Sequence, residues 1–402
     1  MLSRALDKVG GRLRHFLPAW EEITEDAYIL SVVRDGFSIE IEAFPHGAIR
    51  IASPPSSTLH HQYIAAEIAA LVEKDAIERA TDNPNLCLSA IFVIPKRSGK
   101  LRMILNMKRI NTFIPAEHFW METLATILPS LEASDLAVSL DLRDAYFHIP
   151  NHPASRGALP FRLRPAPRVF TRIVTTVAAY LRNQGLRLFV YLDDWLIVAD
   201  SEAKLQAHLS LLLWVTQSLG FMINWEKSEL TPSRVPMYLG ARIDIPNQLA
   251  RPSPDRVRSI TSLAHSVRGR SHVKARVWLQ LLGYMASLVD IIQDCRLYMR
   301  PFQRHLRYCS PGADSLQSRI PLPLSISRSL APWTRPAFVA QGKPLQTPLP
   351  SVSVTTDASL SGWGGHCEGE MVSGAWAYPG ALPHINVSEM QATSNALRHF
   401  QH

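Results

Sequence analysis

The chain of 402 residues is poor in cysteine and lacks long apolar runs. Its four cysteines, Cys87, Cys295, Cys309 and Cys367, are far apart and form no CxxC pair, which argues against a zinc site and a disulfide framework. No apolar stretch approaches the roughly 18 residues of a membrane span, and the N-terminus lacks a signal-peptide core. We therefore expect reduced thiols, no membrane partner and an intracellular location, cytoplasmic or nuclear.

Acidic residues are also fewer than basic ones. The 34 Asp and Glu are outnumbered by 42 Lys and Arg, which gives a formal net charge of +8. This balance favours a polyanionic partner such as nucleic acid, although many basic proteins bind none. Hydrophobic residues make up 47% of the chain and charged residues 19%, which excludes a disordered protein and predicts roughly two to four folded domains.

Residues 190–199, with the sequence VYLDDWLIVA, predict the two arms of a β-hairpin with Asp193 and Asp194 at its turn. An Asp-Asp pair also suits a solvated surface turn. The apolar flanks, however, predict buried strands, and buried elements seldom end in paired charge that nothing neutralises. A divalent metal ion would neutralise these two carboxylates.

A third carboxylate follows another predicted strand. Residues 137–140 are typical of a β-strand, and Asp141 follows them at the end of that strand. Taken alone, an Asp in this position is often only a helix cap. Around these segments, apolar spacing predicts a helix over residues 60–78, strands over 88–95 and 101–107, and helices beginning near Ala166 and Leu205. Gly220 is a suitable stop for the last of these helices.

The four residues from Tyr191 to Asp194, YLDD, resemble the YxDD box of reverse transcriptases. YLDDWLIVA followed by LGF at 219–221, IN at 223–224 and KS at 227–228 is similar to retrotransposon polyproteins of the DIRS type. The resemblance covers nearly the whole chain. It implies an α+β fold with the palm and fingers of a right-hand polymerase, built from an antiparallel sheet with helices, then a helical thumb and a partial ribonuclease H-like α/β module.

The resemblance implies an RNA-directed DNA polymerase, a nucleotidyltransferase of a transposable element. Asp141, Asp193 and Asp194 would be its catalytic residues and would hold two Mg²⁺ ions, with Mn²⁺ as the alternative. The implied partners are an RNA template, a DNA primer, an RNA–DNA hybrid and deoxynucleoside triphosphates.

The resemblance also implies nucleotide-binding residues. Lys96 and Arg102 match residues that grip the triphosphate, where cations offset the charge that the leaving pyrophosphate gathers. Tyr146 matches the bulky residue that excludes a ribose 2′-hydroxyl, and Lys227 matches a lysine that serves as general acid for the leaving group. From the residues alone, Lys96 and Arg102 suit an exposed hairpin with solubilising cations better than a triphosphate site, and Lys227 equally suits a surface lysine.

Five regions are expected along the chain. They are an N-terminal lead-in segment over residues 1–55, fingers and palm over 56–245, a basic helical thumb over 246–310, a Pro-rich connector over 311–350 and a truncated ribonuclease H-like domain over 351–402. The thumb assignment rests on eleven Lys and Arg against three Asp between residues 251 and 310, a pattern that suits phosphate binding and also a merely soluble helical domain. In the last region, Asp357 and Glu389 match the first two metal-binding carboxylates of ribonuclease H.

Three departures from the family pattern bear on activity. Only 18 residues separate Asp141 from Pro160, where relatives insert a β-hairpin. Arg162 stands where the family has a glycine that lets the backbone approach the substrate. Two ribonuclease H carboxylates are too few for two-metal hydrolysis. Two alternatives therefore stay open, namely a catalytically dead nucleic-acid-binding remnant and a ribonuclease H-type nuclease acting on RNA–DNA hybrids.

Overall fold

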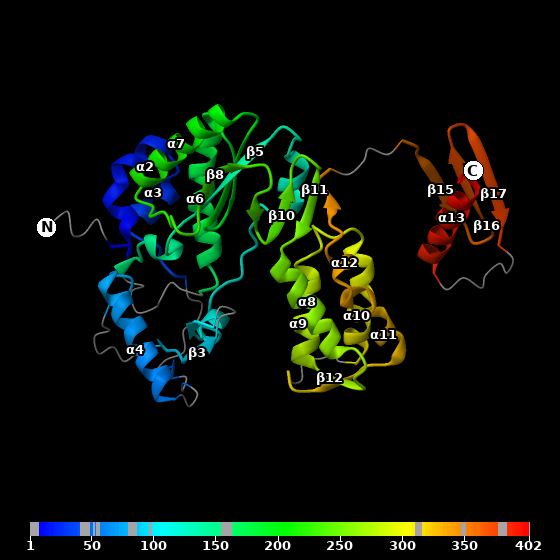
Figure 1. Ribbon diagram of the computed structural model, residues 1–402, viewed down its shortest axis with the longest axis horizontal. Coiled ribbons are helices and arrows are strands. Elements are labelled where there is room, and N and C mark those ends of the chain that lie inside the picture. The colour runs from blue at the N-terminus through cyan, green and yellow to red at the C-terminus, as the bar shows by residue number, and fades with distance from the viewer. Residues whose placement is uncertain are drawn as a thin grey trace. The chain divides into compact units, whose positions relative to one another are not determined.

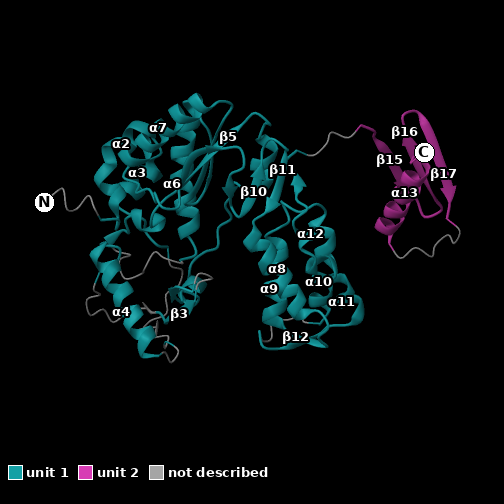
Figure 2. Cartoon of the chain, viewed as in Figure 1, with its two compact units in different colours: residues 1–346 teal, residues 347–402 magenta. Residues whose placement is uncertain are grey.

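The structure, a computed structural model, describes residues 8–40, 49–50, 53, 57–78, 87–95, 99–153, 163–309, 316–346, 351–376 and 384–401. The chain divides into two compact units, residues 1–346 and 347–402, which Figure 2 shows in teal and magenta. Within the described part of the chain, no helix is long and apolar enough to cross a membrane.

The first unit mixes helices and strands along the chain (Figure 1). Its helices are η1 (Arg12–Phe16), α2 (Leu17–Ile23), α3 (Ala27–Arg34), α4 (Thr58–Glu73), η2 (Ile110–Phe113), α5 (Leu124–Ile127), η3 (Leu128–Ser130), η4 (Ala145–His148), α6 (Ala166–Asn183), α7 (Glu202–Ser218), α8 (Pro254–Val267), α9 (Ala275–Ala286), α10 (Cys295–Cys309), α11 (Leu324–Ser329), η6 (Pro332–Thr334) and α12 (Pro336–Val339). Its strands are β1 (Ile49–Arg50), β2 (Cys87–Leu88), β3 (Ile91–Pro95), β4 (Leu101–Leu105), β5 (Leu136–Asp141), β6 (Arg187–Tyr191), β7 (Asp194–Ala199), β8 (Glu229–Ser233), β9 (Met237–Tyr238), β10 (Ala241–Asp244), β11 (Leu249–Pro252), β12 (His272–Lys274), β13 (Arg319–Pro321) and β14 (Lys343–Pro344). The α+β class expected from the sequence is confirmed.

An antiparallel sheet with the strand order β6-β7-β5-β8 carries the hairpin predicted over residues 190–199. Side chains alternate along β7, so Trp195 and Ile197 enter one hydrophobic core while Leu196 and Val198 enter another. Burial on both faces explains why this strand is an unbroken apolar run. The hairpin is confirmed, but its turn lies one residue earlier than predicted: residues 192 and 193 form it, and Asp194 is the first residue of β7.

The N-terminal segment packs into the same core as α6 and α7. Trp20 of α2 is fully buried, and its Nε1 donates to the carbonyl oxygen of Leu219 at 3.0 Å, where α7 ends. Gly220 follows with a φ of +91°, and a Cβ on it would lie 2.4 Å from the Phe16 ring. The glycine stop predicted after α7 is therefore confirmed, and both its backbone conformation and its surroundings require glycine.

A second sheet, ordered β14-β11-β10-β9, shares a core with α8, α9 and α10. Trp278 of α9 and Phe302 of α10 are fully buried in it, with ring centroids 6.1 Å apart. Residues 251–310 contain the helices α8, α9 and α10, together with the strand β12. The helices expected near residues 60, 166 and 205 are also present as α4, α6 and α7, and the two strands expected between 88 and 107 are β3 and β4.

The extended connector expected over residues 311–350 is wrong for residues 316–346. These residues fold onto the helical unit, where β13 pairs with β12, β14 pairs with β11 and Trp333 is fully buried. Proline content misled the prediction because Pro332 and Pro336 stand at the starts of η6 and α12. A proline is tolerated there, since the first N–H groups of a helix have no intrahelical partner.

The second unit has three antiparallel strands, β15 (Val354–Ala358), β16 (Gly362–Cys367) and β17 (Glu370–Ala375), followed by the helix α13 (Ile385–His399). Ala392 and Ala396 of α13 are fully buried against this sheet. A Cβ on Gly365 of β16 would lie 2.7 Å from the Ala396 Cβ, so glycine permits the close approach of helix and strand.

Candidate active site

The ends of two central strands bring the three predicted catalytic carboxylates together. Asp141 is the last residue of β5 and Asp194 is the first residue of β7, and the antiparallel register places them directly opposite each other. Opposed residues in such a pair have Cβ atoms about 5 Å apart. The backbone N–H of Leu142 donates to the carbonyl oxygen of Asp193 at 2.9 Å, which ties the turn residue to the end of β5.

A loop over residues 224–228 holds Asp141 at several atoms. Asn224 Nδ2 donates to Asp141 Oδ1 at 2.7 Å, and the Asn224 backbone N–H donates to the Asp141 carbonyl at 2.8 Å. The Asp141 backbone N–H donates to Ser228 Oγ at 3.0 Å, and that hydroxyl donates to the Asn224 carbonyl at 2.8 Å. Lys227 Nζ lies 3.6 Å from Asp141 Oδ2. Both oxygens of the Asp141 carboxylate therefore have a partner within the loop.

Buried His148 fixes the chain just before this loop. Its Nε2 accepts from the backbone N–H of Met222 at 2.9 Å, so its Nδ1 carries the proton and donates to the Ala145 carbonyl at 3.1 Å. Both contacts together require a neutral imidazole. Burial lowers the pKa of His148 to about 4, which keeps the ring neutral at physiological pH.

The turn that carries Asp193 is strained. Leu192 has a φ of +54°, a left-handed conformation that costs a non-glycine residue about 1–3 kcal/mol. Two aromatic side chains hold it: Trp195 Nε1 donates to the Leu192 carbonyl, and the Tyr238 hydroxyl donates to the Asp194 carbonyl, each at 2.9 Å. Such strain is concentrated at functional sites, and no local pattern in the sequence predicts it here.

Burial and mutual repulsion disfavour negative charge on the hairpin carboxylates. Burial, with the charges of Asp193 and Asp141, raises the pKa of Asp194 to about 6. Burial also raises the pKa of Asp193, with a further increase from Asp141, while Lys227 acts in the opposite direction. The charge of Asp141 contributes to both shifts, and the charge of Asp193 contributes to that of Asp194, so these carboxylates interact electrostatically.

The carboxylates suit a hard divalent cation. Mg²⁺ prefers carboxylate oxygens, and a cation among these groups would remove the repulsion that raises their pKa values. No three His, Cys, Asp or Glu side chains among the described residues are already arranged as ligands of one metal ion. Lys227 Nζ lies 3.6 Å from Asp141 Oδ2, so it competes with a cation for this oxygen. The donor set fits Mg²⁺ provided that Asp141 exchanges Lys227 for the cation.

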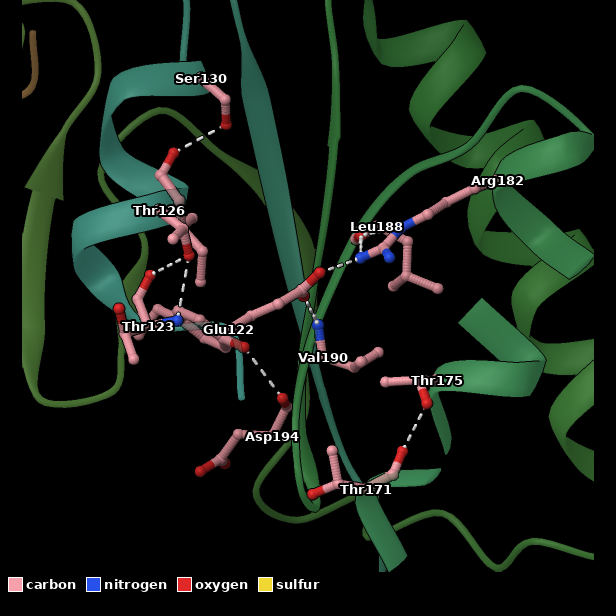
Figure 3. Close-up of polar contacts among 12 residues, drawn as sticks. Glu122, Thr123, Thr126, Ser130, Thr171, Thr175, Arg182, Leu188, Val190 and Asp194 are labelled. Carbon is pink, nitrogen blue, oxygen red and sulfur yellow. Dashed lines mark hydrogen bonds and ion pairs between the residues drawn. The ribbon is translucent and has the colours of Figure 1, made fainter. Parts of the chain in front are cut away.

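Side chains cover the outer edge of β6, the edge strand of the sheet (Figure 3). Glu122 accepts from the Val190 backbone N–H at 2.7 Å and pairs with Arg182, whose guanidinium donates to the Leu188 carbonyl. This Glu122–Arg182 clamp satisfies a donor and an acceptor that no neighbouring strand reaches. It ends one residue before the YLDD sequence, so it supports the strand that leads into the site.

Residues 154–243 match the family model described as reverse transcriptase (RNA-dependent DNA polymerase). The Transposon Tf2-3 and Tf2-7 polyproteins of Schizosaccharomyces pombe are 24% and 23% identical to this chain over 184 residues. Each match covers 42% of this chain and 13% of the polyprotein, so the chain spans about an eighth of the length of these curated relatives.

Two solved structures of a foamy viral protease-reverse transcriptase resemble the chain over 90% of its length. The complex with RNA/DNA hybrid has a TM-score of 0.61 at 13% identity, with 49% of that chain covered. The complex with double-stranded DNA has a TM-score of 0.59 at 15% identity, with 76% of that chain covered. The chain has a reverse transcriptase fold. The expectation of a polymerase fold is thereby confirmed.

In this reverse transcriptase fold, Tyr146 lies beside the carboxylates. It belongs to η4, its ring packs on Phe170 with centroids 5.2 Å apart, and it lines a small cavity together with Ala166 and Val169 of α6. Burial raises the pKa of the Tyr146 hydroxyl to about 12, and the charge of Asp193 adds to the shift. The hydroxyl is therefore neutral at physiological pH.

Of the two predicted triphosphate-binding residues, Lys96 and Arg102, the structure describes only Arg102. Arg102 is exposed on β4, where it influences the pKa of Tyr63 on α4, and no described contact joins it to the three aspartates. Lys96 and Arg162 lie outside the described residues. Residues 154–159 of the short segment between Asp141 and Pro160 also lie outside them.

The ribonuclease H residues are on different elements of the second unit. Asp357 is exposed on β15, and Glu389 is half-buried on α13. Thr356 faces α13, because its hydroxyl lies 3.0 Å from the Thr393 hydroxyl, so Asp357 projects from the other face of the sheet. Among the contacts of the described residues, none joins Asp357 to Glu389.

Replacing Glu122 tests whether the clamp supports the hairpin. Glu122→Ala leaves the Val190 N–H without its acceptor, so we expect the free energy of unfolding to fall by about 1–3 kcal/mol. Glu122→Gln keeps a carbonyl oxygen for Val190 and should lose less. Urea denaturation measures the loss, and amide hydrogen exchange across residues 187–191 should quicken only in the Ala variant. Equal exchange in both variants would contradict a supporting role for this contact.

Proposed function

We propose that this chain is the RNA-directed DNA polymerase of a retrotransposon and performs two-metal nucleotidyl transfer at Asp141, Asp193 and Asp194. The observation that carries the proposal is the β5–β7 register, which sets Asp141 opposite Asp194 with Asp193 bonded beside them. The reverse transcriptase fold and the similarity to transposon polyproteins support it. When bound, Mg²⁺ supplies Lewis-acid stabilisation of the oxygens that enter and leave the reacting phosphorus.

The chain's own residues supply binding and selection. Tyr146 would block a ribose 2′-hydroxyl and so select deoxynucleotides. Arg102, together with Lys96, would neutralise the triphosphate. Lys227 would give a proton to the leaving pyrophosphate. Because Lys227 contacts Asp141 in this structure, it has to leave that carboxylate before it can serve the leaving group.

We also infer that the element is of the DIRS type, from the motif YLDDWLIVA and the residues that follow it. The second unit is ribonuclease H-like in this proposal, with Asp357 and Glu389 as candidate metal ligands that would have to come together, since Asp357 projects from the sheet face away from α13. Three antiparallel strands followed by a helix support it.

A primer-extension assay tests the polymerase proposal. The purified chain, an RNA template with an annealed DNA primer, deoxynucleotides and Mg²⁺ should give extended primer, and EDTA should abolish extension. Binding of the hybrid without extension would instead favour a non-catalytic remnant. The engagement of Asp141 by Asn224 and Lys227 is the observation that favours this second function. A remnant should bind nucleic acid in a salt-sensitive way that Asp193→Asn leaves unchanged.

The raised pKa of Asp194 predicts a pH-dependent gain in stability when its charge is removed. The native carboxyl, with a pKa of about 6, binds more protons than the unfolded one between about pH 4 and pH 6, so the wild type loses stability as pH rises through this window. Without metal, Asp194→Asn should melt at a higher temperature than the wild type above pH 6, and the difference should shrink towards pH 4. Mg²⁺ should raise the melting temperature of the wild type more than that of the variant. A difference that does not vary with pH would contradict the coupled carboxylates.

A further inference from the structure

Two adjacent residues near the start of the chain contact segments that flank the carboxylate site. The backbone N–H of Gly11 donates to the carbonyl oxygen of Phe147 in η4 at 2.8 Å. The next residue, Arg12, donates from its Nε to the Gly220 carbonyl oxygen at 2.8 Å, and this bond is partly buried. The N-terminal segment therefore joins η4 to the end of α7, although these two segments are far apart in the sequence.

A third hydrogen bond closes these contacts into a ring. The Met222 backbone N–H donates to Nε2 of His148 at 2.9 Å, and His148 is fully buried. Each of the three bonds is joined to the next through only one or two peptide links. We call the three bonded pairs the three-segment ring; they are Gly11–Phe147, Arg12–Gly220 and Met222–His148.

The N-terminal part of this ring is anchored in the core. Leu13 and Trp20 are fully buried in the hydrophobic cluster that also contains residues of α6 and α7. The Trp20 ring lies 6.0 Å from the ring of Phe221, and Phe221 in turn lies 5.5 Å from the His148 ring, measured between centroids. The start of the chain is therefore a fixed support for the ring and not a free arm.

On its other side, the ring continues into the loop that holds Asp141. The Met222 carbonyl oxygen accepts from the Arg143 backbone N–H at 2.8 Å, two residues after Asp141. Two residues after Met222, Asn224 bonds to the Asp141 backbone and carboxylate. A displacement of Met222 would therefore be passed to both ends of this contact with Asp141.

We propose that Arg12 and His148 are positioning residues for nucleotidyl transfer. Through the three-segment ring they fix Met222, and through Met222 they set the place of the loop over residues 224–228, which carries Asn224 and Lys227. A misplacement of about 1 Å can cost about 100-fold in rate, so such a support affects the reaction from a distance. The proposal rests on the proposed function for the reaction, whereas the ring itself can be tested without catalysis.

Three variants of the full chain alter the ring. Arg12→Met keeps most of the side-chain length and removes the donor to Gly220. His148→Phe keeps an aromatic ring and removes the acceptor for the Met222 N–H. His148→Gln keeps a side-chain oxygen that can accept from the same N–H, so it should restore what His148→Phe loses.

Arg34→Met is the matched control for Arg12→Met. Arg34 belongs to the same N-terminal segment, but it is exposed, and its Nε lies 3.3 Å from the carboxylate of the adjacent Asp35. Thermal melting shows which variants are folded. If His148→Phe does not fold, Arg12→Met decides the test, because it alters a side chain that is only half-buried.

Hydrogen–deuterium exchange across residues 221–224 tests the ring directly. Arg12 bonds to a carbonyl oxygen, so its replacement deprives no backbone N–H of a partner. Faster exchange at Met222 in Arg12→Met would therefore report a displacement passed along the chain. We expect exchange to quicken by up to about tenfold in Arg12→Met and His148→Phe, and to stay near the wild-type rate in His148→Gln and Arg34→Met.

Single-turnover extension of an RNA-templated DNA primer tests the effect on the reaction. At saturating nucleotide, Arg12→Met and His148→Phe should be slower by about 10- to 100-fold, with the half-saturating nucleotide concentration little changed. His148→Gln and Arg34→Met should keep most of the rate. The double variant Arg12→Met/His148→Phe should be no slower than the slower single variant, because both substitutions break the same ring.

Unchanged exchange and rate in Arg12→Met, losses that multiply in the double variant, or a His148→Gln variant as slow as His148→Phe would overturn the proposal. The failure of the proposed function has a different signature. If exchange changes as expected in a chain whose wild type extends no primer, the ring is present and the polymerase function is contradicted.

Discussion

Asp193→Asn should reduce incorporation of a deoxynucleotide by about 10³-fold or more, which corresponds to roughly 4 kcal/mol of transition-state stabilisation. Asp193 lies in the strained turn, and its charge raises the pKa of Asp194, so it takes part in the cluster that would hold the cations. The amide keeps the shape of the side chain and removes its charge. Single-turnover extension of an RNA-templated primer at saturating nucleotide measures the loss.

Asp200→Asn is the matched control. Asp200 follows the same strand, is exposed and pairs with Lys204 at 3.1 Å across one helical turn. An exposed pair of this kind contributes little, so incorporation by this variant should stay within about twofold of the wild type. Equal activity of the Asp193 and Asp200 variants would remove the hairpin carboxylates from the chemistry.

Trp195→Ala should lower the free energy of unfolding by about 3–5 kcal/mol, a large part of the stability of an ordinary domain. Trp195 is fully buried, its ring lies 6.4 Å from that of Phe221, and its Nε1 bonds to the strained Leu192. The substitution removes the ring from the core and one of the two contacts that hold the turn. Urea denaturation followed by circular dichroism gives the loss.

Trp214→Ala tests whether burial is the cause. The residue type and the substitution are the same, but Trp214 is 62% exposed on α7. Its loss should change stability by no more than about 0.5 kcal/mol. If the two variants were equally destabilised, the packing of Trp195 would not explain the stability of the hairpin.

Much of the central sheet follows from local pattern. The apolar runs before and after Asp193 and Asp194 predict the hairpin, and the run of β7 is unbroken because that strand is buried on both faces. Helix α6 is also visible, since Val169, Ile173 and Val177 recur at helical spacing and are all buried. Proline misled the prediction in residues 316–346, because its position at a helix start cannot be told from a connector by composition.

The supports of the site could not be predicted from the sequence alone. Asn224 and Ser228 stand in segments that resemble retrotransposon polyproteins, but only the tertiary fold brings them to Asp141, more than eighty residues earlier. Glu122 has no distinctive neighbours, and its role depends on the edge of β6, far along the chain. The partner of Lys227 is a further example. The sequence suggests a nucleotide-binding lysine, whereas the structure pairs it with Asp141.

Anomalous diffraction from crystals soaked with Mn²⁺ is the most direct test of the carboxylate site. We expect an anomalous peak within bonding distance of the Asp141 carboxylate and of at least one carboxylate from Asp193 and Asp194, with Lys227 moved away from Asp141. A structure in which Mn²⁺ binds elsewhere while Lys227 stays on Asp141 would contradict the account.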